Sequence, residues 1–232
     1  DVTLEVGPGS GNLTKHILEK NPKKLIIIEK DKFLINKFLK NFENDVVIIN
    51  KDILKISEEN LSNEKMIIFG NLPYNISTKI LVKWIKLKNL NYICKRLILM
   101  FQKEVADRII AKTNTKDYGR LSILSSWRLD IKKIKEINPR CFFPVPKVKS
   151  TVLLIKPKEN YFKFKNPNNL EYITNIFFNQ RRKMIKKPLN FLFGNSNEIS
   201  KKLNLNLTDR PQNLSPEIFY EICKEYENSL SQ

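Results

Sequence analysis

The hydrophobic residues in the first half of the chain form short continuous runs, separated by helical patterns. The clearest run is Leu25–Ile28, in which four apolar side chains follow one another without polar alternation. Such runs predict strands of a parallel sheet that is buried on both faces, with helices in the connections. We expect strands at residues 2–6, 24–29, 46–50, 66–70 and 97–101, and helices at residues 12–20, 32–42, 78–86 and 104–111. The predicted fold class is a doubly wound, Rossmann-like α/β domain.

The pattern changes after residue 118. We expect a helix at 118–127 and strands at 129–137 and 151–156, joined by a loop that is rich in proline. A polar stretch between Pro157 and Pro167 is typical of a linker. Beyond it the periodicity predicts four helices, at residues 170–179, 181–193, 197–203 and 216–229, the last with Ser215 as N-cap and Pro216 as its first helical residue. The sequence therefore predicts two domains, residues 1–157 (α/β) and residues 168–232 (small and all-helical).

The composition is strongly basic, with 42 Lys and Arg against 24 Asp and Glu and a net charge of +18. This excess favours binding to a polyanion such as nucleic acid, although a solubility surface or a compositional bias of the source is the alternative interpretation. Three separated cysteines and a single histidine predict no disulfide framework and no metal site. No apolar run approaches the ~20 residues that span a membrane, and no signal peptide is evident, so we expect a cytoplasmic protein.

A glycine-rich stretch, Glu5–Gly11, lies between the first expected strand and the first expected helix. Its spacing, G-x-G-x-G, differs from the dinucleotide fingerprint G-x-G-x-x-G, and Pro8 removes an amide that a pyrophosphate would use. An acidic residue beside the turn instead suits a ligand with a cationic part, such as an amino acid. A tight turn without a ligand is the alternative. The candidate cofactor contacts in this stretch are Glu5, Gly7, Gly9 and Gly11.

Acidic residues also follow the next two expected strands. Glu29, followed by Lys30, ends the second strand, where a carboxylate can accept both hydroxyls of an adenosine ribose. Asp52 follows the third strand and can accept from an adenine amino group, with Ile53 against the ring. Each alone is ordinary for a solvated strand end. Three acidic residues at the carboxyl edge of one sheet, however, predict S-adenosylmethionine as the cofactor, with Glu29, Lys30, Asp52 and Ile53 among its contacts.

The motif Asn71-Leu72-Pro73-Tyr74 follows the fourth expected strand, at the same edge. The N6 amine of adenine is a poor nucleophile because its lone pair is delocalised into the ring. Two acceptors, the Asn71 side-chain oxygen and the Pro73 carbonyl, would bond both amine hydrogens and aim the lone pair at a sulfonium methyl. Tyr74 offers a face on which an extruded base can stack. The alternative is a turn with a structural aromatic residue.

Together with further motifs, Glu5–Gly11 and Asn71–Tyr74 resemble the rRNA adenine N6-dimethyltransferase family. The further motifs are Phe101–Ala106, Tyr118–Ser122 and Cys141–Ser150, and Asn179–Lys183 and Arg210–Ser215 resemble its small-subunit branch. The resemblance covers nearly the whole chain. It implies an S-adenosylmethionine-dependent enzyme that dimethylates adenosines of small-subunit (16S-type) ribosomal RNA during ribosome biogenesis. The implied partner is this RNA or a pre-30S particle, the implied form a monomer without metal, and residues 1–157 the cofactor-binding domain.

The resemblance also implies cofactor contacts at Gly7, Glu29, Asp52 and Asn71, and stacking of Phe142 on the target base opposite Tyr74. Members normally carry a further N-terminal segment, with a Gln-Asn-Phe-Leu-like stretch that closes over the methionine end of the cofactor. This stretch does not occur in the sequence, which opens directly into a strand pattern without an initiator Met, so we expect the natural chain to continue upstream of Asp1. Val145 stands where small-subunit members more often have proline, so this loop alone does not exclude a large-subunit (23S) adenine methyltransferase.

A basic stretch follows the first expected helix of the second domain. A solvated helix face is one interpretation, and contact with RNA phosphates is the other. The candidate RNA-binding residues are Arg181, Arg182, Lys183, Lys186 and Lys187. A non-catalytic RNA-binding assembly factor is the alternative from a different functional class. A dinucleotide oxidoreductase is disfavoured by the glycine spacing and by Asn71–Tyr74.

Overall fold

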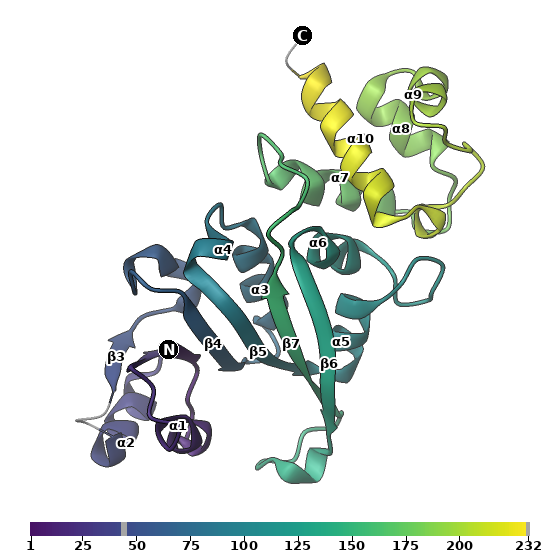
Figure 1. The fold of residues 1–232 in the computed structure, drawn as a ribbon. Coiled ribbons are helices and arrows are strands. Elements are labelled where there is room, and N and C mark those ends of the chain that lie inside the picture. Colours follow the sequence, from purple (N-terminus) through teal and green to yellow (C-terminus); the bar gives the residue numbers. More distant parts are fainter. Residues whose placement is uncertain (43–45, 231–232) are drawn as a thin grey trace. The chain divides into compact units, whose positions relative to one another are not determined.

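The computed structural model describes residues 1–42 and 46–230, which form two compact units (Figure 1). Unit 1 consists of residues 1–106 and 129–159, and unit 2 of residues 107–128 together with the chain from residue 160 onward. This division places residues 107–128 with the C-terminal helices, whereas the expected domains, 1–157 and 168–232, divide the chain by sequence alone. Those domain limits stay a prediction.

A seven-stranded sheet forms the centre of unit 1, in the order β3-β2-β1-β4-β5-β7-β6. The strands are β1 (Val2–Val6), β2 (Lys24–Glu29), β3 (Val47–Asn50), β4 (Met66–Asn71), β5 (Cys94–Gln102), β6 (Leu129–Ile137) and β7 (Ser150–Pro157). β1 to β5 pair in parallel, and β7 pairs antiparallel with both β5 and β6. The predicted Rossmann-like α/β class is confirmed. From β1 the chain adds β2 and β3 on one side of the sheet, and then β4 and β5 on the other. The strand order therefore reverses between β1 and β4, and the carboxyl ends of these two strands flank the crevice where this fold binds ligands.

Burial on both faces explains the unalternated apolar strands. All five residues of β1 are buried, and Leu25–Ile28 of β2 are each 2% exposed or less. On one face, Ile17 of α1 (Asn12–Leu18) packs against Leu25 and Ile27. The other helices along this part of the chain are α2 (Lys32–Phe42), α3 (Ser77–Lys86), α4 (Leu90–Ile93) and α5 (Lys103–Ile110), the last of which runs into unit 2.

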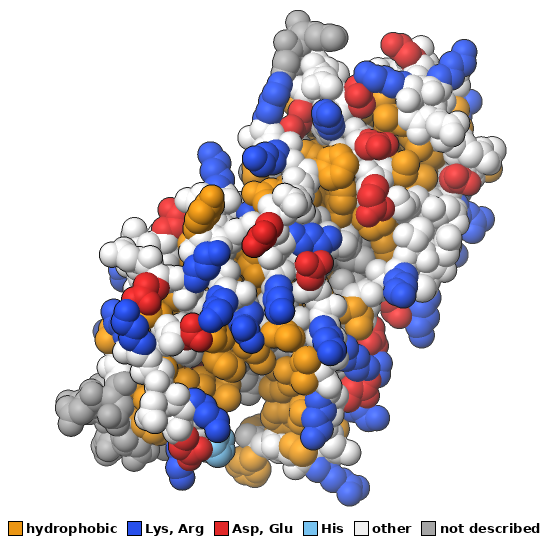
Figure 2. Space-filling model, viewed as in Figure 1, with side chains coloured by type: hydrophobic (Ala, Val, Ile, Leu, Met, Phe, Trp, Pro, Cys, Tyr) orange, Lys and Arg blue, Asp and Glu red, His pale blue; other side chains and the backbone are white. Residues whose placement is uncertain are grey.

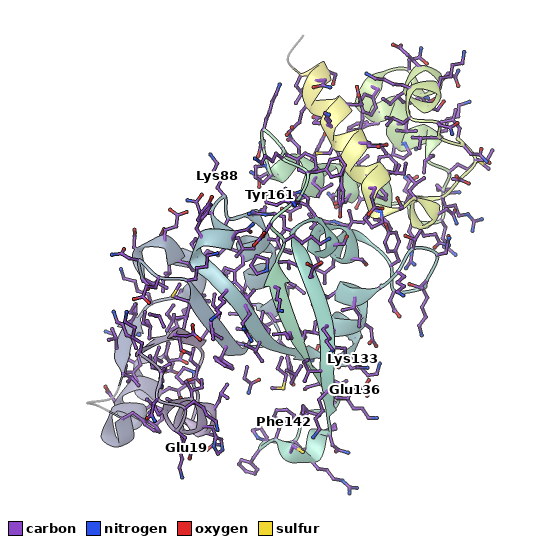
Figure 3. All side chains as sticks on the ribbon, viewed as in Figure 1. Glu19, Lys88, Lys133, Glu136, Phe142 and Tyr161 are labelled. Carbon is purple, nitrogen blue, oxygen red and sulfur yellow. The ribbon has the colours of Figure 1, made fainter. Side chains whose placement is uncertain are left out.

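The edge of the sheet at β6 is basic. Lys and Arg side chains gather over the β7 and β6 end of the sheet (Figure 2). On β6, Lys132, Lys133 and Lys135 are exposed, and Lys133 pairs with Glu136 at 2.5 Å, as Figure 3 shows. Charged side chains of this kind keep an edge strand from pairing with another chain.

Unit 2 is helical, with α6 (Arg120–Arg128), α7 (Asn168–Phe178), α8 (Lys186–Phe193), α9 (Ser196–Lys202) and α10 (Pro216–Ser229). Phe177 and Phe219 form its centre, with ring centroids 5.3 Å apart. The hydroxyl of Tyr118 donates to the Leu214 carbonyl at 2.9 Å, which ties residues 107–128 to the C-terminal helices. In the described part of the chain, no helix is long and apolar enough to cross a membrane.

The prediction of one helix over residues 181–193 is wrong for residues 181–185. Residues 179–183 form turns, in which the Lys183 amide donates to the Gln180 carbonyl at 2.8 Å. The Ile185 amide donates to the Asp209 carbonyl at 2.8 Å, and α8 begins at Lys186. This long-range bond takes the amide out of the helical ladder, and local periodicity cannot reveal such a bond.

Candidate active site

The carboxyl ends of the parallel strands bring the predicted site residues to one edge of unit 1. Val6 of β1 lies opposite Ile28 of β2 on one side and Gly70 of β4 on the other. The next residues along the strands are Gly7, Glu29 and Asn71. A Cβ atom on Gly7 would lie 4.0 Å from the carbonyl oxygen of Asn71, so the glycine turn and the Asn71 motif are adjacent.

The glycine turn has a backbone that other residues adopt at a cost. Gly7, Gly9 and Gly11 have φ values of 70°, 57° and 84°, in the left-handed region. No atom lies within 4 Å of a Cβ built on Gly9, so this part of the turn faces open space. The Gly7 amide already donates to the Ile28 carbonyl and the Gly11 amide to that of Pro8, both at 3.0 Å. Pro8 also lacks an amide, so three residues of this turn offer no free backbone donor to a pyrophosphate.

Glu5 lies beneath the turn and is 1% exposed. Its Oε2 accepts a hydrogen bond from the Thr14 hydroxyl of α1 at 2.6 Å. Burial raises the pKa of this carboxyl group, and the bond from Thr14 partly opposes the rise. One oxygen of Glu5 therefore anchors α1 to β1. The predicted contact between Glu5 and a cationic ligand stays a prediction.

Glu29 is held in place by the backbone that follows it. Its Oε1 accepts from the amides of Lys30 and Asp31, at 2.7 and 2.9 Å. Asn50, its neighbour on β3, donates from Nδ2 to the carbonyls of Glu29 and Lys30, each at 3.0 Å. These bonds fix one Glu29 oxygen, and the described residues supply no partner for the other. Sequence reasoning missed Asn50, although its position at the end of an expected strand was visible; its register with Glu29 comes from the structure.

Asp52 begins the loop after β3. Its Oδ1 accepts from the Leu54 amide at 3.0 Å, at the start of a short 3₁₀ helix (Ile53–Lys55), and its Oδ2 lies 3.3 Å from Nζ of Lys30. The bond from Leu54 and the nearby Lys30 cation hold the pKa of Asp52 below its usual value. Ile53 is 5% exposed. The predicted contacts Lys30, Asp52 and Ile53 are thus brought together at the same edge as Glu29.

A network of hydrogen bonds around the buried Glu58 holds this loop in place, and sequence reasoning missed it. Nζ of Lys83, on α3, donates to the carbonyls of Ile53 and Ile56 at 2.8 and 2.6 Å and to Oε1 of Glu58 at 2.6 Å. Glu58 is fully buried, and its Oε1 also accepts from the indole of Trp84 at 2.7 Å. Lys83 is separated from Glu58 by 25 positions and from Ile53 by 30. No sequence pattern links residues so far apart, so only the tertiary structure reveals this network.

The Asn71–Tyr74 motif, at the end of β4, has one buried residue with an exposed residue on each side of it. Leu72 is 1% exposed, whereas Asn71 and Pro73 are exposed. The Pro73 carbonyl, which was expected to accept from the substrate amine, accepts the amides of Ile76 and Ser77 at 3.1 and 3.0 Å. Its two lone pairs therefore serve the start of α3. The expected substrate role of Pro73 stays a prediction. The four-residue motif in the sequence does not reveal that the Pro73 carbonyl accepts the first hydrogen bonds of a helix.

Tyr74 connects the motif to the loop that carries Phe142. Its hydroxyl lies 2.8 Å from Oγ of Ser150, the first residue of β7. Phe142 is half-buried in the loop between β6 and β7, at the same end of the sheet, where Figure 3 labels it. The Lys103 amide donates to the Lys149 carbonyl at 2.9 Å, so the returning end of the loop is attached at two points. Stacking of Phe142 and Tyr74 on one base stays a prediction.

The basic residues of unit 2 divide into two groups. Arg181 is half-buried, and its Nη2 donates to the Thr115 carbonyl at 3.1 Å, which is a structural contact. The side chains of the others are exposed and line one surface cavity: Arg182, Lys183, Lys186 and Lys187. Residues 1–42 and 46–230 contain no group of three or more His, Cys, Asp or Glu that could hold a metal ion.

Comparison with known proteins bears on the chemistry of this edge. The model of the ribosomal RNA adenine dimethylase family matches residues 1–228. The chain belongs to this family. Membership confirms the predicted enzyme class, an rRNA adenine dimethyltransferase that depends on S-adenosylmethionine.

Two relatives and two solved structures illustrate the likeness. The chain is 56% identical to ribosomal RNA small subunit methyltransferase A of Pelagibacter ubique, over 97% of this chain and 86% of that one. It is 43% identical to the protein of that name from Ehrlichia ruminantium, over 95% and 84%. A dimethyladenosine transferase from Plasmodium falciparum superposes with a TM-score of 0.79 and 25% identity, over 98% and 90%. The 23S rRNA methyltransferase ErmE shares the fold, with a TM-score of 0.67 and 20% identity, over 98% and 91%.

Proposed function

We propose that this protein transfers methyl groups from S-adenosylmethionine to N6 of adenosines in small-subunit ribosomal RNA, twice per adenosine, during ribosome biogenesis in the cytoplasm. The observation that carries the proposal is the exposed Asn71 beside the Gly7 turn, at the edge that also holds Glu29 and Asp52. The small-subunit assignment is supported by the names of the relatives, and by the two motifs of unit 2 that resemble this branch.

The residues at this edge fit the cofactor. The open space at Gly9 admits a ligand close to the backbone, and Glu29 keeps one carboxylate oxygen available for ribose hydroxyls. Asp52 stays ionised because its pKa is lowered, so it can accept from an adenine amino group. When bound, S-adenosylmethionine supplies a methyl group on a positively charged sulfur.

Asn71 performs the catalytic role by orientation. Its side-chain oxygen accepts a hydrogen from the adenine amine, which favours a pyramidal nitrogen with its lone pair directed at the methyl group. The Leu72 carbonyl, for which the described residues supply no donor, is the backbone acceptor next in the chain to Asn71. Tyr74 and Phe142 hold the extruded base by stacking, with Tyr74 fixed by its bond to Ser150. No strong base is needed, because the amine proton becomes acidic only after the methyl group has moved.

The exposed cations of unit 2 hold the RNA. Arg182, Lys183, Lys186 and Lys187 make no ion pair with any described residue, so their charges are available to phosphates. Phosphate contacts position an RNA without reading its sequence. Selection of the target then depends on the shape of the folded RNA around it.

The Asn71→Ala variant tests the proposal. Methyl transfer to an immature small-subunit particle should fall by about a hundredfold or more, because the group that orients the amine is lost. Binding of the particle should persist, and mapping of N6,N6-dimethyladenosine by mass spectrometry should place the wild-type product in small-subunit RNA. Asn63→Ala, another exposed asparagine of unit 1, is the matched control and should retain activity. Unchanged turnover of Asn71→Ala would contradict the catalytic role.

A further inference from the structure

Two adjoining cavities open on the surface of unit 2, beside the turn before α8. The larger, here the basic cavity, has a volume of about 610 Å³ and five cationic residues in its wall: Arg182, Lys183, Lys186, Lys187 and Arg210. The smaller, here the aromatic cavity, has a volume of about 240 Å³, and Phe191 and Met184 line it. Lys183, Met184 and Lys187 line both cavities, so the two form one continuous surface.

The walls of these cavities are fixed by hydrogen bonds. The bond from the Ile185 amide to the Asp209 carbonyl joins the turn before α8 to the segment that carries Arg210. Ile185 is fully buried, and the Lys183 amide is bound within its own turn. The surface is therefore formed before any ligand arrives, and binding does not require this segment to fold.

The charge on this surface has no internal counterpart. None of the five cations makes an ion pair with a described residue, and no carboxylate lines either cavity. Elsewhere in the same unit a lysine does find a partner, as Lys202 does in Glu225 at 2.5 Å. A fixed group of unpaired cations favours a polyanion, because each phosphate that is neutralised releases condensed counterions.

Phosphate binding alone does not explain the apolar residues between these cations. Phe191 is 69% exposed and Met184 56% exposed, both in contact with solvent on a preformed surface. A paired RNA helix presents phosphates and hydroxyls, which need no aromatic partner. An unstacked base exposes its flat faces, and stacking on an aromatic side chain beside a cation is the usual way in which proteins hold single-stranded RNA.

We propose that the two cavities together bind an unpaired nucleotide of RNA, with its base against Phe191 and Met184 and its flanking phosphates in the basic cavity. This inference rests on the proposed RNA substrate and makes it more specific. Unit 2 then recognises a single-stranded element, in addition to the adenosine that is methylated at unit 1. Phe191 and Arg210 become RNA contacts that the basic sequence pattern alone does not indicate.

The test uses the full chain and two fluorescent RNA probes, a single-stranded oligoadenylate of about ten nucleotides and a blunt duplex of about 16 base pairs. Phe191→Ala should bind the single strand between about fivefold and a hundredfold more weakly, with an unchanged salt dependence. Its affinity for the duplex should equal that of the wild type. Lys186→Ala with Lys187→Ala should weaken both probes and reduce the slope of log affinity against log salt by about one or more. Tyr92→Ala, an aromatic residue of unit 1 that is 79% exposed, is the control and should change neither.

Two results overturn the inference: normal binding of the single strand by Phe191→Ala, or an equal loss for single strand and duplex. Unchanged thermal unfolding of Phe191→Ala, expected for an exposed side chain, excludes misfolding as the cause of any loss. Methyl transfer by the wild type to the small-subunit particle is measured in parallel. If the wild type methylates the particle while Phe191→Ala binds single strands normally, the nucleotide site is refuted and the proposed function stands. If the wild type transfers no methyl group, the proposed function itself fails.

Discussion

Lys83 offers the sharpest test of how the tertiary structure supports the cofactor edge. We expect Lys83→Met to lower the free energy of unfolding and to weaken the binding of S-adenosylmethionine. The substitution keeps most of the aliphatic stem but removes the donor to the carbonyls of Ile53 and Ile56 and to Glu58. The Ile53 carbonyl lies one residue after Asp52, so the loop that is expected to hold the adenine ring loses its support.

The magnitude follows from the burial of Glu58. This side chain is fully buried, and its Oε2 has no hydrogen-bond partner, so without Lys83 only the Trp84 indole faces the carboxylate. Removing one partner of a buried ion pair costs about 3–5 kcal/mol, because the remaining charge is left uncompensated. We expect a loss within this range for Lys83→Met. Glu58→Gln combined with Lys83→Met should lose less than the sum of the single variants, since the pair is removed together.

Urea unfolding, followed by circular dichroism, measures the stability of the four proteins of this double-mutant cycle. Isothermal titration with S-adenosylmethionine and steady-state kinetics measure the functional part, for which we expect a higher KM for the cofactor with a smaller change in kcat. Lys79→Met, on the exposed side of the same helix, is the matched control, with an expected change within about 0.5 kcal/mol. A loss below about 1 kcal/mol for Lys83→Met, or strictly additive variants, would refute the reasoning from the buried charge.

Two further substitutions test other parts of the edge. Tyr74→Phe removes the bond to the buried Ser150 hydroxyl, so we expect a loss of about 1 kcal/mol in unfolding free energy. We also expect a lower kcat with little change in the KM for S-adenosylmethionine. An unchanged kcat would show that this hydrogen bond does not position the aromatic ring. Glu5→Gln tests burial, because the raised pKa of Glu5 means that the folded protein holds the proton more tightly than the unfolded chain. Wild-type stability from this group is therefore lost as the pH rises above its ordinary pKa of 4.5, and Glu5→Gln should gain stability relative to the wild type between about pH 4 and pH 7. Thermal unfolding across this range checks the sign, and a stability difference that stays constant with pH would count against it.

Much of the cofactor edge was predictable because it depends on chain-local signals. The apolar run Leu25–Ile28 predicted a strand buried on both faces, and the glycine spacing after β1 predicted a turn that the positive φ values of Gly7 and Gly9 show. Parallel strands place their carboxyl ends at one edge, so positions along the chain were enough to group Glu29, Asp52 and Asn71. The family could be recognised from the same motifs.

Local patterns failed where a bond joins segments that are distant in sequence. The helix expected to start at Arg181 starts at Lys186, because the Ile185 amide is taken by Asp209. The guanidinium group of Arg181 binds the Thr115 carbonyl, 66 residues away, which the sequence did not indicate. The predicted contact of Arg181 with RNA stays a prediction. Periodicity reports which faces of an element are apolar, and it contains no information about which distant partner a polar group will find.

The sequence by itself determined most of the strands and helices, the residues that gather at the carboxyl edge of the sheet, and the enzyme family. The tertiary structure alone decided which polar groups remain available there. In the folded protein the Pro73 carbonyl accepts from the first amides of α3, and one oxygen of Glu5 accepts from Thr14. The loop after Asp52 is held by the bond from Lys83 to the Ile53 carbonyl. The physical reason is that a strand or helix follows from local steric and hydrophobic preferences, whereas a hydrogen bond between distant groups exists only once the packed fold has brought them within about 3 Å.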